Sequence, residues 1–105
     1  MLARLGTPFL YSLMLGILLF AAGCQTAPPV QEMSDARQAI MAARDAGAEE
    51  KAPDELNQAI EHLQSAEVAL ADKAYARARR DALVAKGRAI DALKQSEAEA
   101  GVSSP

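Results

Sequence analysis

The sequence of 105 residues has few aromatic side chains and a single cysteine. It contains no tryptophan, two tyrosines and two phenylalanines, and only Tyr75 among these follows Cys24. A chain with so few large side chains buries a thin core, so helix propensity must supply much of its stability. With a formal net charge of −3, the chain also lacks the basic surface and the stacking side chains of a nucleic-acid binder. We therefore expect no nucleic-acid partner.

Motifs for catalysis and for metal binding are missing as well. The chain has no glycine-rich phosphate loop and no nucleophile with a base and an orienting group. His62 is the only histidine, and no second strong ligand accompanies it at metal spacing. Its neighbour Glu61 points about 100° away on a helix. We expect no enzymatic activity, no cofactor and no metal, with His62 at the surface and Tyr75 covering one end of the core.

What the sequence does contain begins with an export pattern in residues 1–23. One basic residue, Arg4, precedes an uncharged apolar stretch, and the small residues Ala21-Ala22-Gly23 lead directly into Cys24. These are the parts of a cleaved signal peptide. The apolar stretch is long enough that an uncleaved single-pass membrane anchor is a serious alternative. An ordinary signal peptide followed by a coincidental cysteine is another.

Residues Phe20-Ala21-Ala22-Gly23-Cys24 resemble the lipobox of bacterial lipoproteins, with Ala21 where leucine is commoner. The resemblance implies cleavage between Gly23 and Cys24, a thioether-linked lipid on Cys24, and acylation of the freed amine. A thiolate suits such an alkylation, and several acyl chains give lasting anchoring. Gln25 stands where an aspartate would imply retention in the inner membrane. The resemblance therefore implies an outer-membrane location facing the periplasm, if the cell has an outer membrane.

The mature chain predicts a flexible tether over residues 24–30, a helical domain over 31–100 and a disordered tail over 101–105. The adjacent Pro28 and Pro29 favour an extended tether. The first helix is expected over residues 31–46, with Gly47 as its stop, and residues 48–52 as a connector. The second begins at Pro53. The third follows Asp72 as its cap and runs to about residue 98.

Apolar residues recur at spacings of three and four, which is typical of helices that bury one narrow stripe. The pattern predicts an all-α fold, a short antiparallel three-helix bundle. The alternative is a helical hairpin with the first helix loosely docked. Gly87 either marks a close helix crossing or is merely tolerated. The stripes contain Met33, Ala36, Ile40, Ala43 and Gly47, then Leu56, Ala59, Ile60, Leu63, Ala66 and Leu70, then Tyr75, Ala78, Ala82, Ala85, Ala89 and Ala92, widened by Leu83, Ile90 and Leu93.

A family resemblance covers nearly all of residues 31–98. Ala43-Arg44-Asp45-Ala46-Gly47-Ala48, Ala52-Pro53-Asp54-Glu55-Leu56, Ala66-Glu67-Val68-Ala69-Leu70 and Tyr75-Ala76-Arg77-Ala78 resemble the alanine-rich helical domain of family 4398 of domains of unknown function. The resemblance implies an envelope lipoprotein, but no known activity. Some members carry a peptidoglycan-binding domain, which is not expected in these residues. A helix pair resembling half of a tetratricopeptide repeat is too short for a repeat array.

Lys73, Arg77 and Arg80 form the candidate interaction patch, because they are expected to share one face of the third helix. They could bind anionic lipid, lipopolysaccharide or an acidic partner. Alternatively, they are solvated and paired with Asp81, or with Glu61 and Glu67 across a helix contact.

The functional prediction is a non-enzymatic, lipid-anchored envelope protein with an interaction or scaffolding role. Its partner is expected to be the membrane together with an unidentified envelope protein or a peptidoglycan-associated component. Two alternatives stay open. One is a structural lipoprotein that self-assembles into a homo-oligomer through its alanine stripes, and the other is the uncleaved single-pass protein.

Overall fold

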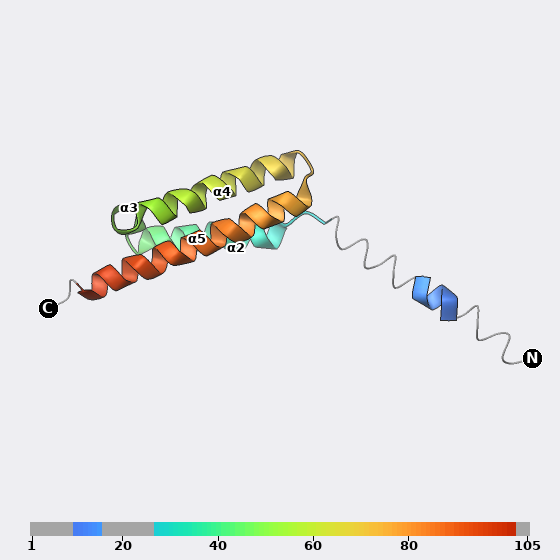
Figure 1. The fold of residues 1–105 in the computed structure, drawn as a ribbon, viewed down its shortest axis with the longest axis horizontal. Helices are drawn as coiled ribbons and strands as arrows, with labels where there is room; N and C mark the ends of the chain where they lie inside the picture. The colour runs from blue at the N-terminus through green and yellow to red at the C-terminus, as the bar shows by residue number, and fades with distance from the viewer. Residues whose placement is uncertain (1–9, 16–26, 103–105) are drawn as a thin grey trace, which may run out of the picture.

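Three long helices lie side by side in the computed structural model, which describes residues 10–15 and 27–102 (Figure 1). The helices are α2 (Val30–Asp45), α4 (Pro53–Ala71) and α5 (Tyr75–Val102), and the short α3 (Ala48–Lys51) joins α2 to α4. Residues 10–15 are helical as well. Every regular element in the described ranges is a helix, which confirms the predicted all-α fold.

Contacts between side chains fix the directions of the helices. Along α2 and α5, Glu32 pairs with Arg79, and Asp35, one turn later, pairs with Lys86. The partners advance in the same direction, so α2 and α5 run parallel, and α4 runs antiparallel to α5 after a tight turn. The result is the predicted up-down-up bundle. The alternative of a loosely docked first helix is wrong, because α2 packs on both α4 and α5 with its own buried face.

The first connection follows the sequence signals closely. Gly47 follows the end of α2 with φ at 87°, a left-handed conformation that glycine adopts without the penalty other residues incur. Pro53 occupies the first turn of α4, where its missing amide hydrogen has no helical partner to lose. The predicted connector is itself a helical turn, α3, and it buries Ala48. The predictions that the first helix stops at Gly47 and that the second begins at Pro53 are therefore confirmed.

Alanine makes up most of the core. Met33, Ile40 and Leu56 are the large apolar core side chains in the described ranges, at 2%, 4% and 2% exposed, and Pro29 is buried as well. Small side chains at the contacts allow the helix axes to approach at the short end of the usual range. The fully buried alanines on the three long helices are Ala36, Ala43, Ala59, Ala66, Ala69, Ala78, Ala82, Ala85, Ala89 and Ala92.

The predicted stripe on α5 differs from the structure at its edges. Leu83 was expected to widen the buried stripe, but it is 51% exposed, whereas Ile90 and Leu93 are half-buried. The last predicted members of the stripe are Ala92 and Leu93, but Ser96 is fully buried one turn beyond Ala92. Its hydroxyl donates to the Ala92 carbonyl at 2.7 Å, so burial leaves no unsatisfied polar group. The predicted disordered tail begins too early, since α5 extends to Val102.

Gly87 lies on the exposed side of α5. A Cβ atom at this position would meet nothing within 4 Å. Of the two interpretations of this glycine, the close helix crossing is wrong.

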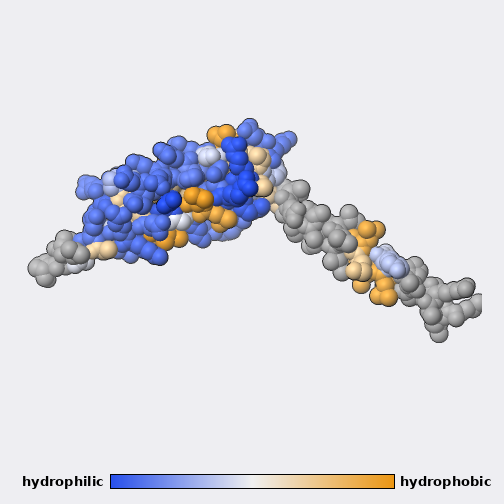
Figure 2. All heavy atoms as spheres, in the orientation of Figure 1, coloured by the Kyte–Doolittle hydropathy of each residue, from blue (hydrophilic) through white to orange (hydrophobic). Residues whose placement is uncertain are grey.

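The surface of the bundle is largely hydrophilic in the view of Figure 2, with a few small apolar areas. Val30, Met41, Val68, Leu83 and Val84 are the exposed large hydrophobic residues of its helices. Among the residues described, none of the helices combines the length and the apolar character needed to cross a bilayer. Gly23, Cys24 and most of the predicted leader lie outside the described ranges.

Candidate functional site

The connection between α4 and α5, residues 72–74, is a tight turn that we call the hinge. The Lys73 amide donates to the Leu70 carbonyl at 3.0 Å, and the Ala74 amide donates to the Ala69 carbonyl at 2.8 Å. This pair of bonds is a Schellman motif, whose central residue adopts a left-handed conformation. Lys73 occupies that position with φ at 61°, the only non-glycine residue in the described ranges with positive φ. The hinge thus presents an exposed lysine where many helices end in glycine.

Asp72 does not cap the third helix, contrary to the prediction. It is the C-terminal cap residue of α4, and its amide donates to the Val68 carbonyl at 3.0 Å. The first helical hydrogen bond of α5 runs from the Ala78 amide to the Ala74 carbonyl at 2.9 Å. The Schellman motif therefore separates Asp72 from the start of α5. Tyr75, the first residue of α5, is half-buried.

Only part of the predicted basic patch lies on one helix. Arg77 and Arg80 are exposed and three residues apart on α5, so they are neighbours on its surface. Lys73 precedes the helix and belongs to the hinge, so the prediction that all three share a helix face is wrong. Arg77 Nε lies 3.9 Å from Asp81 Oδ2. Lys73 and Arg80 make no ion pair within 4.0 Å to any residue that the structure describes.

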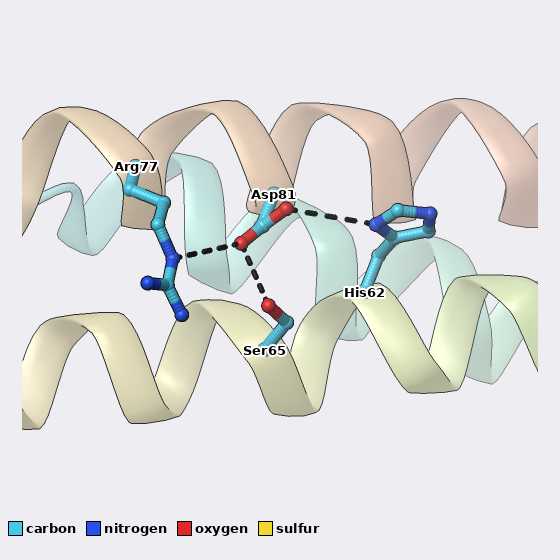
Figure 3. A network of polar contacts seen from close by, with 4 residues as sticks. All are labelled: His62, Ser65, Arg77 and Asp81. Atoms are coloured by element: carbon cyan, nitrogen blue, oxygen red, sulfur yellow. Dashed lines mark hydrogen bonds and ion pairs between the residues drawn. The ribbon is translucent and has the colours of Figure 1, made fainter.

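Asp81 is the centre of a polar network between α4 and α5 (Figure 3). The Ser65 hydroxyl donates to Asp81 Oδ2 at 2.8 Å, and His62 Nδ1 lies 3.6 Å from Asp81 Oδ1. Arg77 approaches the same carboxylate from the opposite side to His62 (Figure 3). Ser65 bonds the carboxylate directly, so the three groups do not form a relay in which a histidine activates a hydroxyl. The network is a cross-link between two helices.

The contacts of His62 and Ser65 with Asp81 were not predicted from the sequence pattern. His62 is a surface histidine as expected, with 40% of its side chain exposed. The spacing of Arg77 and Asp81 on one helix was visible, and this pairing was the expected alternative to an interaction patch. The contacts of Asp81 with α4 depend on the relative placement of two helices, which the sequence pattern does not specify.

A second set of contacts holds the incoming chain against the end of the bundle that contains the hinge, which we call the hinge end. Arg79 Nε lies 3.1 Å from Glu32 Oε1, and its Nη2 donates to the Ala27 carbonyl at 3.2 Å. Pro29 is almost completely buried, and its carbonyl accepts the Met33 amide at 3.1 Å. Residues 27–29, the end of the predicted tether that the structure describes, therefore pack on the bundle.

Two more ion pairs connect α2 to its neighbours. Arg37 Nη2 lies 3.4 Å from Glu67 Oε1 on α4, and Lys86 Nζ lies 3.8 Å from Asp35 Oδ2. Glu67, one of the alternative partners considered for the basic patch, is thus paired with Arg37 of α2 instead. No group of three or more potential metal ligands occurs in the parts of the chain that the structure describes.

The comparison with known families decides what kind of domain this bundle is. The profile of the family described as Domain of unknown function (DUF4398) matches residues 31–102. The chain belongs to the DUF4398 family. The matched DUF4398 region begins one residue into α2 and ends with α5, so it contains all three long helices, the hinge and the Asp81 network. Neither the curated proteins nor the solved structures include a significant match to the chain.

Proposed function

We propose that this DUF4398 protein is a lipid-anchored envelope protein, attached through Cys24, whose helical bundle binds or positions another envelope component without catalysing a reaction. The observation that carries the proposal is the end of the apolar leader. The small residues Ala21-Ala22-Gly23 run directly into the only cysteine of the chain. If Cys24 becomes the lipidated N-terminus, the location is the outer membrane on its periplasmic side, as the identity of Gln25 suggests.

The structure of the bundle is consistent with such a role. The chain enters the domain at the hinge end, where Arg79 and the buried Pro29 hold it. Only two residues separate Cys24 from Ala27, so the domain would stand close to its anchor. The polar residues that could suggest chemistry, His62, Ser65 and Asp81, are engaged in joining α4 to α5. This arrangement supports a binding or scaffolding role.

Replacement of Cys24 by alanine tests the anchor. With the wild-type chain we expect a shorter, acylated product in the membrane fraction. The Cys24→Ala variant should keep its leader, because the resemblance to a lipobox ties cleavage to prior modification of the thiol. A Cys24→Ala variant that is cleaved normally and released in soluble form would show an ordinary signal peptide instead. An unprocessed wild-type chain starting at Met1 would support the single-pass alternative.

Self-assembly remains the second candidate, and the exposed apolar residues are the observation in its favour. The alanine stripes are buried inside a single chain, so an assembly would use a different surface. Leu83 and Val84 are adjacent on α5 and are 51% and 41% exposed. Analytical ultracentrifugation of the detergent-solubilised protein separates the candidates. A monomer at tens of micromolar supports the anchored binding protein, whereas a discrete oligomer that Leu83→Gln dissociates supports self-assembly.

A further inference from the structure

The hinge lies at the end of the bundle where the chain enters. Arg79, in the second turn of α5, donates to the Ala27 carbonyl at 3.2 Å and pairs with Glu32 in the first turn of α2. Figure 1 shows the incoming segment meeting the bundle beside the connection between α4 and α5. We call the opposite end of the bundle, with α3, the distal end.

The position of Cys24 limits how far the hinge end can be from a lipid anchor. Cys24 is three residues before Ala27, and an extended chain spans at most about 3.6 Å per residue, or about 11 Å in all. The Debye length at physiological ionic strength is about 8 Å. Because about 11 Å is the upper limit, a tether that is not fully extended would bring charges at the hinge end within one Debye length of an anionic membrane surface. The distal end, where Gln95 of α5 donates to the Lys51 carbonyl of α3, is separated from them by about 30 Å along α5 at 1.5 Å per residue.

Charge is distributed unevenly between the two ends. The half of the described bundle at the hinge end, residues 27–40 and 59–87, holds six basic and six acidic residues. The distal half, residues 41–58 and 88–102, holds four basic and eight acidic residues. The domain is therefore a charge dipole whose acidic end points away from the entry of the chain. The basic residues of the hinge half are Arg37, Lys73, Arg77, Arg79, Arg80 and Lys86, and those of the distal half are Arg44, Lys51, Arg88 and Lys94.

Within the hinge half, some basic side chains form ion pairs and others do not. Arg37, Arg79 and Lys86 pair with carboxylates of another helix. Lys73 and Arg80 are exposed and form no ion pair to the residues described. Arg77 is 54% exposed and has only a long contact to Asp81 within its own helix. Asp72, which is also exposed, is the one acidic residue within the hinge. The excess of accessible positive charge is thus concentrated at the hinge and the first turns of α5.

We propose that Lys73, Arg77 and Arg80 bind the phosphates of anionic phospholipids and hold the anchored bundle upright, with its acidic distal end away from the membrane. The inference rests on the lipid anchor of the proposed function. Guanidinium and ammonium groups form charge-assisted hydrogen bonds to phosphate. Each basic residue close to an anionic surface strengthens association by about fivefold. The acidic distal end is repelled by the same surface.

Site-specific fluorescence in vesicles tests this orientation. The lipidated protein carries no free thiol at Cys24, so a cysteine introduced by Ala76→Cys near the hinge end, or by Ala98→Cys near the distal end, can be labelled selectively. Both alanines are exposed on α5, about 33 Å apart at 1.5 Å per residue. The labelled protein is reconstituted into phosphatidylcholine vesicles with or without one third of phosphatidylglycerol, each with a quencher on the lipid headgroup. We expect strong quenching at position 76 only with phosphatidylglycerol, and weak quenching at position 98 in both.

Charge reversal supplies the matched comparison. The Lys73→Glu/Arg80→Glu variant should reduce quenching at position 76 in the anionic vesicles to the level of neutral vesicles, since two cations at about fivefold each amount to more than tenfold. Arg88→Glu/Lys94→Glu makes the same charge change with two exposed residues of the distal half and should leave quenching at position 76 unchanged. The Lys73→Gln/Arg80→Gln variant removes the charges without reversing them, so its quenching at position 76 should lie between those of the wild type and the charge-reversed variant. Circular dichroism checks that each variant is folded.

Two outcomes would overturn the orientation. One is equal quenching at position 76 in neutral and anionic vesicles, and the other is equal quenching in the wild type and the hinge variant. Vesicle flotation measures attachment to the membrane, so it tests the lipid anchor independently of the orientation. If the protein floats with vesicles of either composition but quenching at position 76 does not depend on charge, the lipid anchor is supported and the proposed orientation is contradicted. Failure of the wild type to float at all contradicts the lipid anchor itself.

Discussion

At the scale of single residues, two glycines have opposite backbone requirements. Gly47 adopts φ at 87° after α2, whereas Gly87 is helical and a Cβ there would meet nothing within 4 Å. Alanine has the higher helix propensity, so we expect Gly87→Ala to raise the free energy of unfolding by about 1 kcal/mol. Gly47→Ala should lower it by about 1–2 kcal/mol, because its left-handed conformation places a Cβ too close to the following carbonyl. Urea denaturation followed by circular dichroism measures both.

The two variants control for each other because the chemical change is identical. A decrease in the free energy of unfolding for Gly87→Ala would contradict the open space around this position, because it would mean that the added methyl group meets another part of the protein. A neutral Gly47→Ala variant would mean that the turn after α2 can change its conformation.

Lys73 offers a separate test of the hinge. Its φ of 61° is unfavourable for a residue with a side chain, and glycine is the usual occupant of this position in a Schellman motif. We expect Lys73→Gly to raise the free energy of unfolding by about 0.5–1 kcal/mol. Lys73→Ala removes the same charge but keeps the Cβ, so it should change stability much less. Equal effects of the two substitutions, measured by thermal unfolding, would contradict the left-handed hinge.

Single residues were also where sequence reasoning failed most. Asp72 was predicted to cap the third helix because an acidic residue shortly before a helical pattern usually does so. The hinge places Lys73 in the left-handed conformation, and nothing in the sequence marks that lysine as a glycine would have. The cap of α4 and the start of α5 therefore could not be distinguished. Gly47 and Pro53, whose backbone preferences are strong, were predicted correctly.

At the scale of helix pairs, the Asp81 network joins α4 to α5. Ser65 donates to Asp81 at 2.8 Å, and this side-chain bond is partly buried. A double-mutant cycle with Ser65→Ala and Asp81→Ala isolates the contact from other effects of each substitution. We expect a coupling free energy of about 0.5–1.5 kcal/mol, the usual contribution of such a hydrogen bond. Additive single effects in urea denaturation would show that the cross-link contributes nothing.

The alanine contacts between helices set a limit on side-chain size. Ala82 on α5 is fully buried and clusters with Met33 and Ala66 of the two other helices. Ala82→Leu should lower the free energy of unfolding by about 1–3 kcal/mol, because extra methylene groups in a packed core force side chains and backbone to shift. Ala76→Leu places the same side chain on the exposed surface of α5 and should be close to neutral. Scanning calorimetry compares the unfolding temperatures of the two variants, and equal temperatures would contradict the close approach of the helices.

The presence of the helices and their buried stripes could be predicted, because apolar residues spaced three and four apart lie on one face of a helix. On α5, Ala78, Ala82, Ala85, Ala89 and Ala92 are all fully buried as expected. Leu83 was predicted at the edge of the stripe because it is large and apolar, yet it is 51% exposed. Whether a residue at the edge of a stripe is covered depends on how neighbouring helices are rotated. Spacing alone does not determine that rotation.

At the scale of the whole molecule, the bundle has two different ends. The incoming chain, the hinge, Lys73 and Arg80 lie together at one end, and most of the acidic residues lie toward the other. The sequence predicted the helices and the basic patch, but the patch was placed entirely on one helix. Its position beside the entry of the chain follows only from the parallel arrangement of α2 and α5. That arrangement links the basic residues to the proposed anchor.

Mass spectrometry of the protein isolated from its native membrane tests the central proposal, the lipid anchor, most directly. We expect a mature chain that begins at Cys24, with a mass increased by a diacylglyceryl group and by an acyl group on the amine. The matching N-terminal peptide should release fatty acids on alkaline hydrolysis. A chain that begins at Met1, or one that begins at Cys24 with a free thiol, would contradict the account.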